Sequence, residues 1–170
     1  MKTVLLGDSL TAWHDWQECL GPNLNHALPG ETTEDLLYRL ERSLSAAPER
    51  VILMIGTNDL LQRTPLESIK HNYTRLLAEL IEIEALYIVS VPPVADTPHA
   101  TEINADIIAL NDWLKEQLWK YGFTYVDLHA EMTGEDYAIV PGLTVDGVHF
   151  SDAGYTLFER LLKAALDETL

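Results

Sequence analysis

The sequence predicts an α/β fold, a three-layer α/β/α sandwich built around a five-stranded parallel sheet. Short apolar runs alternate with amphipathic segments along the whole chain, which is the pattern of a parallel sheet covered by helices on both faces. The length of 170 residues suits one ordinary core, so residues 1–170 are expected to form a single domain. With 47% hydrophobic and 22% charged residues, the composition is globular rather than disordered.

Five segments are expected to form the strands. In chain order they are Thr3–Leu6, Leu24–Leu28, Val51–Ile55, Leu86–Val91 and Phe123–Val126. The second has the weakest strand pattern because Asn23, Asn25 and His26 dilute its apolar character. Five strands in such a chain favour the flavodoxin-like order 2-1-3-4-5, with ligands bound over the carboxyl ends of the strands near the first one.

Apolar residues at helical spacing predict the helices between the strands. The stripes are Leu36, Leu37, Leu40 and Leu44; Ile69, Tyr73, Leu76, Leu77, Leu80 and Ile81; and Ile103, Ile107, Leu110, Leu114, Leu118 and Tyr121. A last helix is expected after Ser151 and Asp152, where the serine would cap the first turn. We interpret these stripes as core packing rather than as binding surfaces.

The chain is strongly acidic, with 11 Lys and Arg residues against 27 Asp and Glu residues and a net charge of −16. Its mean field repels nucleic acid and anionic lipid surfaces, so neither is an expected partner, and the simplest interpretation is that the acidity serves solubility. No metal or other cofactor is expected, because the histidines outside the motifs described below lack zinc-ligand spacing. These histidines are His14, His26, His71, His99 and His129.

Two features bear on where the protein works. No apolar run approaches the length that crosses a bilayer, and the chain passes from Met1 directly into the first predicted strand. The lone Cys19 cannot form an internal disulfide, which agrees with a reducing compartment. A cytoplasmic location is expected, unless a signal peptide has been removed. No pattern in the sequence predicts the oligomeric state.

Four short motifs follow the predicted strands or end the chain's long last connection. They are Gly7-Asp8-Ser9-Leu10, the glycine of Leu28-Pro29-Gly30-Glu31, Gly56-Thr57-Asn58-Asp59, and Asp146-Gly147-Val148-His149. In this order they resemble the signature blocks of the GDSL esterases, or SGNH hydrolases, from residue 7 to about residue 155. The resemblance implies a hydrolase domain in which Ser9, Gly30, Asn58 and His149 are the four signature residues.

The chemistry of these residues is that of a serine hydrolase. A serine hydroxyl needs a base to remove its proton as it attacks, and His149 is the candidate base for Ser9. Asp146 would accept the other imidazole N–H, and Gly147 permits the turn that this pairing needs. By resemblance, the tetrahedral oxyanion would meet the backbone N–H groups of Ser9 and Gly30 and the side-chain amide of Asn58. Without a β-carbon, Gly30 is expected to let its amide approach the substrate.

The predicted strand order explains how most of these groups converge. Adjacent strands lie about 4.8 Å apart, so the loops after strands 1, 2 and 3 can reach one acyl carbon. His149 follows strand 5, roughly 14 Å away by the same spacing. The segment Leu128–Val148 must therefore bend back across the carboxyl edge of the sheet, and its length suggests a functional loop.

Other interpretations of the same residues remain open. Taken alone, Ser9 is more often a helix cap than a nucleophile, and Asn58 and Asp59 could simply close a turn. By resemblance, Asp8 is structural and stays outside the triad. An α/β-hydrolase elbow would need a second glycine that residues 7–11 lack. A non-catalytic flavodoxin-like binding module is the alternative from another class, although it has no use for Asp146 and His149.

The motifs do not identify the substrate. We expect a serine esterase for small, neutral carboxylic esters such as acetylated sugars, with an acyl thioesterase or lysophospholipase of the same family as the alternative. Little of the chain is left for a lid, so the site is expected to be open and shallow. The side chains expected to border it are Trp13, His14, Trp16, Pro93 and Leu143, although one of the two tryptophans could instead pack the first helix.

Overall fold

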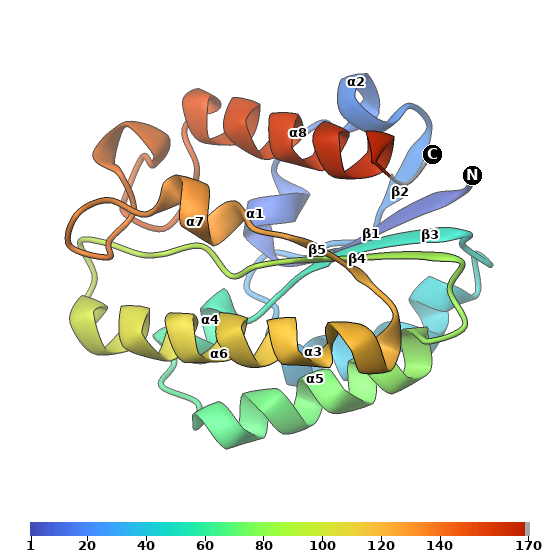
Figure 1. Cartoon of the computed structure of the whole chain (residues 1–170), viewed down its shortest axis with the longest axis horizontal. Helices are drawn as coiled ribbons and strands as arrows, with labels where there is room; N and C mark the ends of the chain where they lie inside the picture. The colour runs from blue at the N-terminus through green and yellow to red at the C-terminus, as the bar shows by residue number, and fades with distance from the viewer. Residues whose placement is uncertain (169–170) are drawn as a thin grey trace.

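The computed structural model describes residues 1–168 and confirms the predicted α/β class and strand order. Five parallel strands pair in the order β2-β1-β3-β4-β5, and helices cover both faces of the sheet (Figure 1). The strands are β1 (Thr3–Gly7), β2 (Asn23–Asn25), β3 (Arg50–Met54), β4 (Ala85–Val89) and β5 (Thr124–Val126). This order leaves β1 with a neighbour on each side, as the motif spacing requires.

The helices divide between the two faces of the sheet (Figure 1). One layer contains α1 (Ser9–Ala12), α2 (Gln17–Leu20), α7 (Leu128–Met132) and α8 (Asp152–Asp167). The other contains α3 (Thr33–Leu44), α4 (Thr57–Leu61), α5 (Leu66–Leu80) and α6 (Ala100–Tyr121). A short 3-10 helix, η1 (Pro141–Leu143), lies in the long connection between β5 and α8.

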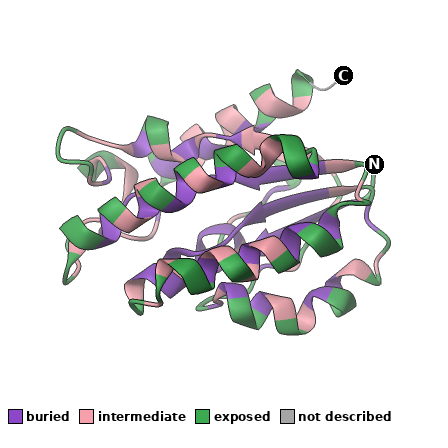
Figure 2. Cartoon of the chain, turned by 60° about the horizontal axis from the view of Figure 1, so that its bottom comes forward, coloured by how far each residue is buried: buried purple, intermediate pink, exposed green. Residues whose placement is uncertain are grey.

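The alternation of side chains along each strand divides the core into two clusters. Val4 and Leu6 of β1 pack with α3, α5 and α6, whereas Leu5 points into the cluster that contains α8. The helix faces that turn toward the sheet are buried and their outer faces are exposed (Figure 2). Nearly all of the predicted stripe residues take part, but Ile81 lies just past α5 and is 48% exposed, so its assignment to the core was wrong.

The second predicted strand was right in place and wrong in its bounds. Beyond Asn25 the segment still runs along β1, since the N–H groups of His26 and Leu28 donate to β1 carbonyls at 2.9 Å. The Asn25 side chain, however, accepts from the N–H of Ala27 at 3.1 Å. An edge strand has no further neighbour to take that N–H, and a local side-chain contact ends the regular strand there.

β3 and β4 also end earlier than predicted. After β4, side chains take over the backbone groups that strand pairing would otherwise use. The side-chain amide of Asn111 bonds both the N–H and the carbonyl of Val91, and Asn104 does the same for Val94, all at 2.9 Å. These two buried asparagines lie two turns apart on α6. They fix the loop after β4 without a neighbouring strand.

The one helix cap predicted from the sequence is present, and the structure adds another. Ser151 caps α8 by accepting from the N–H of Gly154 at 3.2 Å, as predicted. At the start of α3, Thr32 and Asp35 form a reciprocal capping box.

Within residues 1–168, no helix has the length and apolar character needed to cross a membrane.

Candidate active site

Ser9 stands at the carboxyl end of β1, as the first residue of α1. It is only 7% exposed, and the preceding Asp8 caps the helix by accepting from the N–H of Leu10 at 3.0 Å. Gly7 makes this tight exit possible, because a Cβ there would lie 2.4 Å from the carbonyl oxygen of Met54 on β3. The early N–H groups of a helix lack intrahelical acceptors, so the N–H of Ser9 is available to a ligand.

Ser9, His149 and Asp146 form one continuous hydrogen-bonded chain. The Ser9 Oγ lies 3.1 Å from His149 Nε2, and His149 Nδ1 lies 2.6 Å from Asp146 Oδ2. A carboxylate can only accept, so Nδ1 donates to Asp146 and Nε2 is left to accept from the serine hydroxyl. This arrangement can move a proton from a serine hydroxyl to an imidazole.

The Asp146 carboxylate is held in its charged form. Partial burial works in the opposite direction, but hydrogen bonds from the His149 side chain and from the N–H groups of His149 and Val148 lower the pKa of Asp146 to about 2. The two backbone bonds, at 2.7 and 2.9 Å, both reach Oδ1. Asp146 is therefore ionised at neutral pH and fixed in orientation.

The predicted bend of the segment after β5 is present, and backbone contacts hold it. The carbonyl of Gly147 accepts from the N–H of Ala95 at 2.8 Å, which ties the segment to the loop after β4. The hydroxyl of Thr144 accepts from the N–H of Gly147 at 2.8 Å and donates to the carbonyl of His149 at 2.7 Å. The role of Thr144 was not predicted from the sequence, because no local pattern distinguishes it from other loop threonines.

Gly30 lies in a tight turn after β2. The carbonyl of Leu28 accepts from the N–H of Glu31 at 3.3 Å, with Pro29 and Gly30 between them. Gly30 has a φ of +80°, which suits the third position of such a turn. A Cβ there would meet no protein atom within 4 Å, so the positive φ by itself favours glycine, and the close approach of the Gly30 amide to a substrate stays a prediction.

Asn58 connects the loop after β3 to the loop after β2. Its Nδ2 donates to the carbonyl of Glu31 at 3.0 Å, which leaves the second hydrogen of the amide for another acceptor. Asp59 does more than close its own turn, because its carboxylate accepts from the Thr33 N–H at 2.9 Å and the Thr33 hydroxyl at 2.6 Å. The two loops are thus joined twice.

The five predicted pocket residues have different surroundings. The Trp13 ring is 59% exposed and stacks on His149, with centroids 4.6 Å apart. His14 bonds to Glu159 of α8 at 2.9 Å. The remaining three, Trp16, Pro93 and Leu143, are buried or half-buried, and Trp16 packs against Phe158. Trp13 therefore borders the hydrogen-bonded chain of Ser9, His149 and Asp146.

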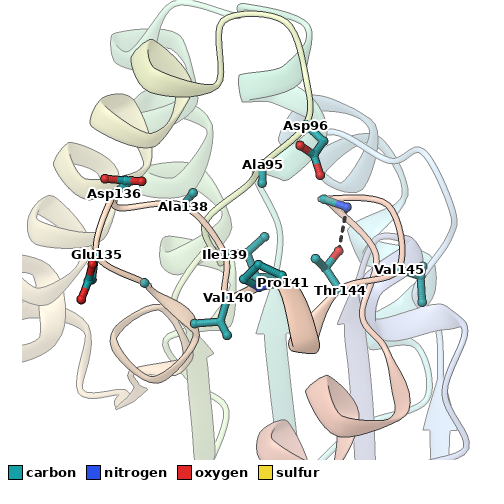
Figure 3. A pocket seen from close by; sticks show the side chains of 12 residues that line it. Ala95, Asp96, Glu135, Asp136, Ala138, Ile139, Val140, Pro141, Thr144 and Val145 are labelled. Atoms are coloured by element: carbon teal, nitrogen blue, oxygen red, sulfur yellow. Dashed lines mark hydrogen bonds between the residues drawn. The ribbon is translucent and has the colours of Figure 1, made fainter.

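A pocket of about 370 Å³ borders the His149 loop (Figure 3). It lies between the loop of Ala95 and Asp96 and the segment 134–147, with Thr144 and Gly147 on one side. Its lining includes the apolar Ile139 but also three carboxylates, those of Asp96, Glu135 and Asp136. Across residues 1–168, no three His, Cys, Asp or Glu side chains gather as a metal-binding group.

Comparison with curated proteins finds an N-acylneuraminate cytidylyltransferase from Streptococcus agalactiae serotype V that is 27% identical over 166 residues. The match covers 97% of this chain but spans only 38% of that relative's length.

The likeness to solved structures extends over the whole fold. A GDSL-like lipase from Bacteroides thetaiotaomicron superimposes with a TM-score of 0.86 at 24% identity, covering 99% of this chain and 89% of that one. A lipase/acylhydrolase from Enterococcus faecalis gives a TM-score of 0.76 at 26% identity, with 100% and 97% covered. A profile of the GDSL-like Lipase/Acylhydrolase family matches residues 5–157. The chain belongs to the GDSL-like lipase/acylhydrolase family.

Proposed function

We propose that the protein is a serine esterase that cleaves small carboxylic esters through an acyl-enzyme intermediate. The observation that carries the proposal is the hydrogen-bonded chain from Ser9 through His149 to Asp146. Membership of a family of lipases and acylhydrolases supports a hydrolase acting on esters. A binding module would gain nothing from a buried serine hydroxyl aligned with an imidazole and a carboxylate.

In the proposed reaction, Ser9 Oγ attacks the acyl carbon while His149 Nε2 takes the hydroxyl proton. Asp146 stabilises the imidazolium that forms. The carbonyl oxygen becomes an oxyanion, which accepts from the N–H groups of Ser9 and Gly30 and from Asn58 Nδ2. The intermediate then collapses, the C–O bond to the alcohol breaks, and the alcohol leaves with the proton from Nε2. Water repeats the sequence on the acyl-serine, releasing the acid and restoring Ser9.

The surroundings of the site favour neutral esters. The strong net negative charge and the nearby carboxylates of Asp96 and Asp136 disfavour anionic acyl or alcohol groups. The longer relative is named an N-acylneuraminate cytidylyltransferase, so acetylated sugars are included among the candidate substrates. A panel of p-nitrophenyl esters of rising chain length, acetylated sugars and an acyl thioester would compare these classes directly.

The first prediction concerns Ser9 and His149. The variants Ser9→Ala and His149→Ala and the double variant should be about equally inactive on p-nitrophenyl acetate, because the two side chains act as one unit. A fluorophosphonate should add once to the parent protein and not to Ser9→Ala, as measured by intact mass spectrometry.

Ser68→Ala and His71→Ala are matched controls, since both side chains are exposed on α5. Both should keep parental turnover and labelling. An unlabelled parent protein, or a Ser9→Ala variant with parental activity, would exclude the proposed esterase mechanism.

A further inference from the structure

An ion pair between Glu31 and Arg39 is nearly buried beside the proposed site. The Glu31 side chain is 5% exposed and that of Arg39 is 19% exposed. Moving two charges out of water is costly, and well-packed apolar residues of similar volume often serve stability as well or better. The pair therefore calls for an explanation other than general stability.

The contacts of Arg39 show what the pair does. Its Nε and Nη2 both donate to the Glu31 carboxylate, the latter at 2.5 Å. Nη2 also donates to the carbonyl of His26 at 2.6 Å, and Nη1 to the hydroxyl of Ser43 at 2.9 Å. One planar guanidinium from α3 thus holds both ends of the segment 26–31, a task that the planar, five-donor fork of arginine suits.

The segment that Arg39 holds supplies one of the three proposed oxyanion donors and orients a second. Gly30 lies within it, and the N–H of Gly30 has no acceptor in the described part of the chain. The Glu31 carbonyl accepts from Asn58 Nδ2 at 3.0 Å, which orients the amide that is proposed to donate with its other hydrogen. A shift of Glu31 would therefore move both donors together.

We propose that Arg39, acting through Glu31, is a positioning residue that fixes the Gly30 and Asn58 donors for the oxyanion. It touches neither substrate nor the reacting atoms. The inference rests on the proposed serine esterase function. Donors help the transition state only when they are aimed in advance at the position of the developing charge. Misplaced donors should therefore lower kcat and leave KM nearly unchanged.

Two variants test this role. Arg39→Lys keeps the charge but cannot bridge His26 and Glu31 as a fork. Because Arg39→Met alone would leave Glu31 buried without a partner and can prevent folding, the second variant combines Glu31→Gln with Arg39→Met. Arg42→Gln is the matched control, since Arg42 lies on the same helix with its side chain exposed.

Both test variants should lower kcat for p-nitrophenyl acetate by roughly 10- to 100-fold, part of the effect of losing an oxyanion donor, with KM within about twofold. Turnover is expressed per serine titrated to completion with a fluorophosphonate, so loss of folded protein does not enter. The affinity for phenylboronic acid, which forms a tetrahedral adduct on a serine, should fall by a similar factor. Arg42→Gln should match the parent in all three measurements.

The inference is overturned if the titrated double variant has parental kcat, or if its kcat falls while its boronate affinity stays parental. Either result, obtained together with an inactive Ser9→Ala variant, would overturn the role of Arg39 but leave the proposed function in place. An active Ser9→Ala would instead remove the proposed function itself, so the two failures are distinguishable.

Discussion

At the scale of single residues, Asp8 shows how burial changes a carboxyl group next to the proposed nucleophile. Asp8 is 1% exposed, its Oδ1 caps α1, and its Oδ2 has no hydrogen-bond partner among residues 1–168. Burial raises the pKa of Asp8 from its ordinary value of 3.8 to about 7, against the opposing effect of the Leu10 hydrogen bond. The chain therefore folds with a carboxyl group that resists ionisation.

The sign of the resulting pH dependence follows from the proton balance. Between about pH 4 and pH 7 the folded protein keeps the Asp8 proton while the unfolded chain releases it, so the free energy of unfolding falls as pH rises through this window. Asp8→Asn cannot ionise and keeps an oxygen for the cap. It should stabilise the protein by roughly 2 kcal/mol at pH 8, with a smaller gain at pH 4.

Urea unfolding at the two pH values measures this difference. Asp15→Asn is the control, because Asp15 is exposed and accepts from the N–H of Gln17 in the same way, at 3.0 Å. A gain for Asp8→Asn that is the same at pH 4 and pH 8 would contradict the assignment of a raised Asp8 pKa.

At the scale of elements, the connection between β5 and α8 brings His149 to the hydroxyl of Ser9. Because β5 is at the far edge of the sheet from β1, the imidazole depends on one fixed path back across the strand ends (Figure 1). Gly147 is sterically constrained within this connection. It has a φ of +88°, and a Cβ there would lie 2.2 Å from the carbonyl oxygen of Ala95. Ala95 follows the part of the β4 loop that Asn104 holds.

Gly147→Ala should therefore displace His149 and lower kcat by about 100-fold, the scale of loss from a misplacement of about 1 Å. It should also destabilise the protein by about 1–3 kcal/mol, as expected for a residue strained at positive φ. Gly142→Ala, in the same connection but without steric contact or positive φ, should behave like the parent. Parental turnover in Gly147→Ala, measured alongside its thermal unfolding, would contradict this account of the path.

At the scale of the whole molecule, charge is expected to set which esters the proposed site meets most often. The net charge of −16 repels anions before any contact is made, and salt screens this repulsion over about 10 Å at 0.1 M ionic strength. The carboxylates of Asp96, Glu135 and Asp136 add to the field near the His149 loop. This repulsion slows the association of anionic substrates with the protein and leaves the rate of the chemical step unchanged.

We therefore expect kcat/KM for an anionic ester, the mono-p-nitrophenyl ester of succinic acid, to rise severalfold as ionic strength increases from about 10 to 200 mM. The value for neutral p-nitrophenyl acetate should stay constant over the same range, which makes it the internal control. Equal salt dependence of the two esters would show that the protein field does not select between them.

Much of the fold and of the candidate site could be predicted, because its signals are local. The periods of the strands and helices and the cap at Ser151 follow from residues close together in sequence. The strand order follows from the alternation of five strands with helices, and the structure confirms all three. The pairing of Asp146 with His149 is local too, since three positions separate them. The bounds of β2 and β4 could not be predicted in this way, because side chains such as Asn111 decide where pairing stops.

The sequence by itself determined the α/β class, the strand order and the motifs that mark this family. The tertiary structure alone decided that Trp13 stacks on His149 while Trp16 is buried, that Arg39 holds the Gly30 turn, and that Ala95 anchors Gly147. The reason is physical. Periodicity and capping depend on neighbours within a few residues, whereas these contacts join segments whose proximity exists only once the sheet has brought them together.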